Sequence, residues 1–113
     1  MKTTAVFDKQ IPLLIRHFEV AFRSGYNVKQ AFEIVARDMP APASGEAQWV
    51  LDQWNSGQHY MQIFEDWLRR TPSRDLDLVI AAIRVQIEIE GNLADTLQIL
   101  AQIMEKRSLP TSS

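Results

Sequence analysis

The sequence predicts an all-α protein, a six-helix bundle built from three helical hairpins. Apolar residues recur with the 3.6-residue period of an amphipathic helix along nearly the whole chain, and Gly, Pro or a capping residue separates the periodic segments. With 113 residues, 46% of them hydrophobic, the chain is long enough for a single folded domain. We expect one domain over residues 1–113, with its core from about 7 to 107 and a flexible tail over 108–113.

The first predicted hairpin joins a helix over about residues 7–23 to a helix that ends before Pro40. Pro12 is expected in the opening turn of the first helix, where a missing N–H is tolerated. Asn27, with Gln30 three residues later, has the pattern of a capping box and begins the second helix.

The second hairpin is predicted to begin at Ser44, with its first helix ending at Gly57. Its second helix is closed by Pro72. The expected buried side chains of this hairpin are Ala47, Val50, Leu51, Trp54, Tyr60, Ile63, Phe64, Trp67 and Leu68.

The third hairpin begins at Ser73, which is expected to cap a helix that runs to about Glu90. Residues 85–90 alternate as a strand would, but a lone strand would have no partner, so we predict a helix there. The last helix follows the Gly91 turn, and its expected seam is Leu93, Leu97, Leu100 and Met104.

An internal repeat supports this division into hairpins. Seven residues recur 32 positions later, and a partial match follows over residues 93–101. Repeats of this length are typical of stacked helical hairpins. The alternative explanation is that a glycine turn before an amphipathic helix is a common local arrangement, which can recur without a true repeat. The first copy is Ser24, Gly25, Gln30, Phe32, Glu33, Arg37 and Pro40, and the second is Ser56, Gly57, Gln62, Phe64, Glu65, Arg69 and Pro72.

Composition and motifs argue against several kinds of function. A net charge of −2 gives no basic field for nucleic acid, and the absence of Cys excludes a thiolate metal site. No apolar run approaches the roughly 20 residues that span a bilayer. His17 and His59 fall in different hairpins, without the additional ligands that zinc requires.

Carboxylates near the Gly91 turn are the remaining candidates for chemistry. Glu88, Glu90 and Asp95 could bridge a divalent cation, but Asp95 lies where negative charge complements a helix dipole. We therefore expect no catalytic residue, no metal and no cofactor. Trp49 is the one tryptophan outside the apolar phase of its helix, which leaves its exposure open.

A dense group of charges surrounds the Pro72 turn, and we predict that it contacts a partner protein. The alternative is a solvated turn whose charges lie near helix ends. The members of this charged corner are Arg69, Arg70, Arg74, Asp75 and Asp77.

The order of these motifs, from Ile11 to Arg107, resembles the type II secretion system F domain. The most specific element is the turn Glu90, Gly91, Asn92, Leu93, Ala94, Asp95, Thr96 and Leu97, where the family typically reads Gly-Gly-Asn-Leu-Ala-Glu-x-Leu. Two positions depart from the family: Glu90 replaces a glycine, and Glu105 stands where a basic residue is common. The transmembrane helices that normally follow are also absent, and we expect these residues to be an excised portion of a longer protein rather than a detached version.

The resemblance implies a non-catalytic domain of an inner-membrane platform protein, in type II secretion, type IV pilus or tight-adherence pilus systems. Such a domain would lie on the cytoplasmic face and join the membrane only through the missing transmembrane region. Its expected partners are the assembly ATPase and other platform components, with self-association as a further option, and it would couple the ATPase to pilin movement. The alternative is a stand-alone adaptor of the tetratricopeptide kind, although the Trp-x2-Leu-Gly-x2-Tyr pattern is missing.

Overall fold

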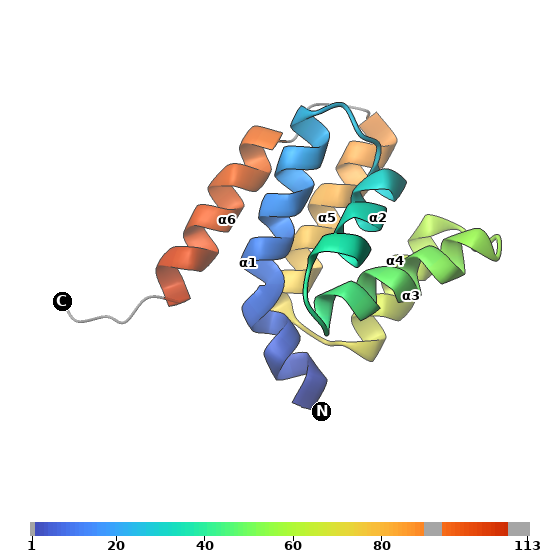
Figure 1. Ribbon diagram of the computed structural model, residues 1–113, viewed down its shortest axis with the longest axis horizontal. Helices are drawn as coiled ribbons and strands as arrows, with labels where there is room; N and C mark the ends of the chain where they lie inside the picture. The colour runs from blue at the N-terminus through green and yellow to red at the C-terminus, as the bar shows by residue number, and fades with distance from the viewer. Residues whose placement is uncertain (1, 90–93, 109–113) are drawn as a thin grey trace.

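The computed structural model describes residues 2–89 and 94–108, and these ranges form six helices without a strand (Figure 1). The all-α prediction is confirmed, and residues 85–89 are helical. None of the described helices is long and apolar enough to cross a membrane. The helices are α1 (Lys2–Arg23), α2 (Val28–Asp38), α3 (Ala43–Asn55), α4 (Tyr60–Arg70), α5 (Arg74–Ile89) and α6 (Ala94–Ser108).

The predicted grouping into three sequential hairpins is not confirmed. The two most extensive helix pairs are α1 with α6 and α2 with α3. Figure 1 shows α6 lying along α1, while α3 and α4 project to the opposite side of the bundle. The packing of α6 is explained by its buried face, which consists of Leu97, Ala101 and Met104.

Two helix starts differ from the prediction. Helix α1 begins at Lys2, so Pro12 lies inside the helix and leaves the carbonyl of Asp8 without its usual N–H donor. Helix α3 begins at Ala43, after the N-cap residue Pro42, which makes no side-chain capping bond. Ser44 is therefore the second helical residue, and its amide donates to the carbonyl of Pro40.

The centre of the core is a cluster of aromatic rings around Phe32, which is completely buried. Its ring lies 5.0 Å from Phe18, 5.7 Å from Trp67 and 6.2 Å from Phe64, measured between centroids. Because these rings come from α1, α2 and α4, the cluster ties three helices together.

The internal repeat corresponds to equivalent local structures. Helices α2 and α4 each have 11 residues, and their preceding turns contain Gly25 (φ +91°) and Gly57 (φ +99°). A residue other than glycine rarely adopts this left-handed conformation. Asn27 caps α2 through the predicted capping box, and His59 occupies the equivalent N-cap position of α4.

Candidate interaction surface

The charged corner is held by a well-bonded turn between α4 and α5. The hydroxyl of Thr71, which is buried, donates to the carbonyl of Trp67 at 2.9 Å. The hydroxyl of Ser73 accepts from the amide of Leu76 at 3.1 Å, so Ser73 caps α5 as predicted. This turn places Arg69 and Arg70 at the end of α4, and the remaining members of the corner, Arg74, Asp75 and Asp77, in the first turn of α5.

Arg70 is directed back onto α3 rather than fully into solvent. Its guanidinium carbon lies 4.2 Å from the centroid of the Trp49 ring, and its Nη1 lies 3.5 Å from a carboxylate oxygen of Glu46. The same oxygen of Glu46 accepts the indole N–H of Trp67 at 3.0 Å. Trp49 is therefore half-buried beneath Arg70, and this arginine supports the joint between α3 and α4.

Glu46 was not among the residues singled out by sequence. It is 8% exposed, and it falls in the buried phase of α3 with Ala43, Ala47 and Val50. A carboxylate at an apolar position of a helix is the signal that could have identified it, because buried charges require partners.

The other members of the corner differ in how they are engaged. Arg69 pairs with Asp66 at 2.7 Å and remains largely exposed, whereas both oxygens of Asp75 accept from Nη2 of Arg107 at 2.7 Å. Within residues 2–89 and 94–108, the side chains of Arg74 and Asp77 have no ion-pair partner, and both are exposed. The structure thus brings the end of α6 to this corner and leaves Arg69, Arg74 and Asp77 accessible.

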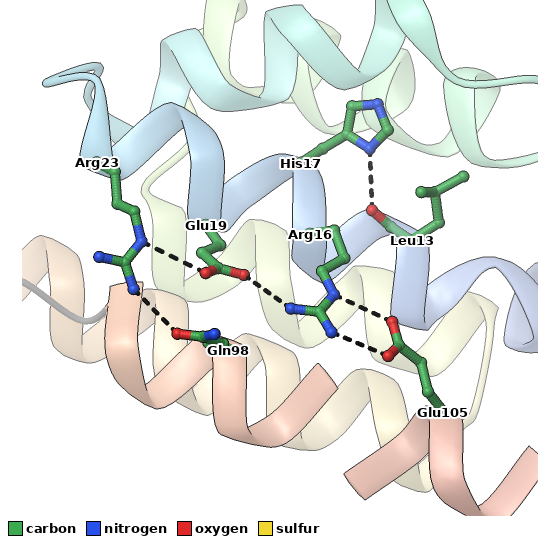
Figure 2. Close-up of polar contacts among 7 residues, drawn as sticks. All are labelled: Leu13, Arg16, His17, Glu19, Arg23, Gln98 and Glu105. Carbon is green, nitrogen blue, oxygen red and sulfur yellow. Dashed lines mark hydrogen bonds and ion pairs between the residues drawn. The ribbon is translucent and has the colours of Figure 1, made fainter. Parts of the chain in front are cut away.

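The second polar arrangement joins α1 to α6, and Figure 2 shows the contacts described here. Arg16 donates to both oxygens of Glu105, from Nε at 3.0 Å and from Nη2 at 2.9 Å. These hydrogen bonds from Arg16 lower the pKa of Glu105, and the same carboxylate raises the pKa of Arg16. Glu105 therefore has a specific partner on α1.

The polar row continues along the same side of α1. Glu19 is 8% exposed and lies between Arg16 at 3.3 Å and Arg23 at 3.4 Å. Arg23 in turn donates to the side-chain oxygen of Gln98 at 3.2 Å (Figure 2). Since Gln98 meets Arg23 while Glu105 meets Arg16, α6 runs antiparallel to α1.

The family turn is only partly described. Leu97 is buried at 1% exposure and belongs to the face of α6 that packs on the bundle. Glu90, Gly91, Asn92 and Leu93 lie outside the described residues, as does the side chain of Asp95.

The residues considered for chemistry have local structural partners. Nδ1 of His17 lies 2.9 Å from the carbonyl of Leu13 (Figure 2), and the side chain of His59 accepts from the amide of Met61 at 3.2 Å. Glu88 accepts the hydroxyl of Tyr60 at 2.8 Å, which raises the pKa of Tyr60. Among the described residues, no group of three His, Cys, Asp or Glu side chains could hold a metal ion.

Comparison with known proteins identifies one family. No curated protein and no solved structure matches the chain. The family described as "Type II secretion system (T2SS), protein F" matches residues 14–109, which is most of the sequence. This range includes the charged corner, the Gly91 turn and all of α6. The chain therefore belongs to the type II secretion system protein F family.

Proposed function

We propose that this domain is a non-catalytic scaffold that binds the assembly ATPase of a secretion or pilus machine and helps couple that ATPase to pilin movement. The family supplies platform-protein domains of secretion and pilus systems, and its match over residues 14–109 is the observation that carries the proposal. In this proposal the domain faces the cytoplasm, and transmembrane segments elsewhere in the protein anchor it in the inner membrane.

The accessible part of the charged corner supports an ATPase contact there. Arg69 and Arg74 are exposed on either side of a turn in which the hydroxyls of Thr71 and Ser73 are both hydrogen-bonded to the backbone. A rigid turn with exposed arginines can bind carboxylates on a partner with little loss of conformational entropy.

The outer face of α6 supports a second contact, with other platform components or with a second copy. Ile99 and Ile103 are 59% and 52% exposed, on the side of the helix opposite the buried Leu97 and Ala101. Two exposed isoleucines one turn apart form an apolar ridge that a partner helix could cover.

The test is a calorimetric titration of the purified domain against the secretion-type ATPase encoded nearby. The variant Arg69→Glu/Arg74→Glu should weaken binding roughly tenfold, because two exposed cations that face the partner become anions. These two arginines are preferable to Arg70, whose reversal would also disturb Glu46 and Trp49.

The matched control is Lys9→Glu/Lys29→Glu, which makes the same change of net charge on α1 and α2. Circular dichroism should show that both variants remain folded. A folded domain that does not bind the ATPase, or a control that weakens binding as much as the corner variant, would contradict the proposal.

A further inference from the structure

A groove of about 320 Å³ lies between α4 and α5, next to the charged corner. Phe64 and Ile80 are the buried residues of its lining, and Leu68 is partly buried. Met61 also lines the groove. It is a large apolar side chain, yet 48% of it is exposed to solvent. Methionine adapts its shape readily to a bound surface, so the groove offers an apolar seat for a partner side chain.

The polar residues of the groove carry an excess of negative charge. Asp77 and Glu65 are exposed, and neither side chain has an ion-pair partner within the described ranges. The cation in the lining is Arg84, whose Nε lies 4.0 Å from Glu88. Two carboxylates thus remain available to a positively charged partner, while Arg84 has an anion of its own nearby.

We infer that this groove binds a basic amphipathic helix of a partner protein. Apolar side chains of that helix would pack on Met61 and Leu68, above the buried Phe64 and Ile80, as in other helix-in-groove complexes. Its Lys or Arg side chains would pair with Glu65 and Asp77. Asp77 belongs both to the groove and to the charged corner, so the two surfaces adjoin. The inference deepens the proposed function. It rests on that proposal only for the identity of the protein that carries the helix.

The test uses two labelled synthetic peptides of about 18 residues, one built from Leu and Lys and one from Leu and Glu, each with an amphipathic pattern. Fluorescence anisotropy measures the binding of each peptide to the intact domain. The Leu/Lys peptide should bind, its affinity should fall as salt is added, and the Leu/Glu peptide should bind much more weakly. Amide chemical shifts should change at Met61, Leu68 and Ile80.

The variant Glu65→Gln/Asp77→Asn keeps the size of both side chains and removes both charges. It should weaken the Leu/Lys peptide by about fivefold, whereas Glu33→Gln/Asp52→Asn, which makes the same change on α2 and α3, should leave binding nearly unchanged. Equal weakening by the two variants, equal affinity for the two peptides, or absence of binding would each overturn the inference.

A second copy of the chain is the competing occupant of the groove. Sedimentation velocity distinguishes the two: a dimer that the groove variant dissociates would assign the groove to self-association and overturn the inference. Failure of the ATPase titration with successful peptide binding would remove only the proposed function. ATPase binding that the groove variant leaves unchanged, together with failed peptide binding, would remove only this inference.

Discussion

Arg16 and Glu105 form a two-point ion pair across 89 residues of sequence, with distances of 3.0 and 2.9 Å. The pair joins the middle of α1 to the last turns of α6, and Glu19 contacts the same guanidinium at 3.3 Å. A bidentate guanidinium–carboxylate pair fixes direction as well as distance. It therefore specifies how α6 lies on α1, in addition to the apolar contacts that hold it there.

Glu105→Gln should lower the free energy of unfolding by a small amount, because the neutral amide offers Arg16 one acceptor and no charge. Glu105→Lys should lower it further, since a cation would then face Arg16. Urea denaturation at low and high salt checks both changes, and the loss should shrink as salt is added. Glu33→Gln, on an exposed site of α2, is the control and should have little effect.

The same pair gives a pH dependence with a defined sign. Because Arg16 lowers the pKa of Glu105 in the folded state, the unfolded state takes up the proton at higher pH. The stabilisation is complete above the ordinary glutamate pKa of about 4.3 and is lost as pH falls through the lower folded value. The difference in unfolding free energy between wild type and Glu105→Gln should therefore disappear in acid. A difference that persists unchanged to about pH 3 would contradict this account.

Glu46→Ala should destabilise the domain by about 1–3 kcal/mol, because it leaves the indole N–H of Trp67 buried without an acceptor. Glu46→Gln keeps an acceptor oxygen and should cost less. Thermal denaturation followed by tryptophan fluorescence measures both variants. If Ala and Gln cost the same, the hydrogen bond to Trp67 does not contribute as described.

His59→Asn should stabilise the domain by about 0.5 kcal/mol. Asparagine is a favoured N-cap residue, and Gln62 lies three residues later, as Gln30 does after Asn27. The substitution would thus give α4 the capping box that α2 has. The reciprocal variant Asn27→His should lower the urea midpoint, and a gain in stability from that variant would show that the two caps are not equivalent.

Arg70→Glu should reduce stability more than Arg74→Glu does. The first change places a carboxylate beside Glu46 and removes the cation from the face of Trp49, whereas Arg74 is exposed and has no described ion-pair partner. Urea midpoints of the two single variants provide the comparison. Equal midpoints would mean that Arg70 does not support the joint between α3 and α4.

Much of the fold could be predicted from local signals. The glycine turns, the capping box at Asn27 and the cap at Ser73 lie where the sequence indicated, because each depends on residues within one or two turns. The predicted start of α1 was wrong because Pro12 resembles a first-turn proline. In the structure Pro12 lies inside the helix, where packing on the core outweighs the lost hydrogen bond.

Long-range pairing could not be predicted in the same way. The order of the helices in the sequence suggested sequential hairpins, but α6 packs on α1. A single sequence contains no signal that joins Arg16 to Glu105. The residues of the charged corner lie on either side of one turn, at the end of α4 and the start of α5, yet they differ in their side-chain partners. Which arginine faces inward depends on Glu46 and Trp49 in another helix, and periodicity does not show this.

The antiparallel seam between α1 and α6 also determines how the domain would carry mechanical load. A pull along the axis of α6 would act in shear on the contacts of Gln98 and Glu105 with α1 and of Arg107 with α5 together, instead of opening them one after another. Contacts loaded at the same time share the force, so the seam would resist sliding better than peeling. Tension applied at the end of α6 would therefore pass to α1 and α5 through these side-chain contacts.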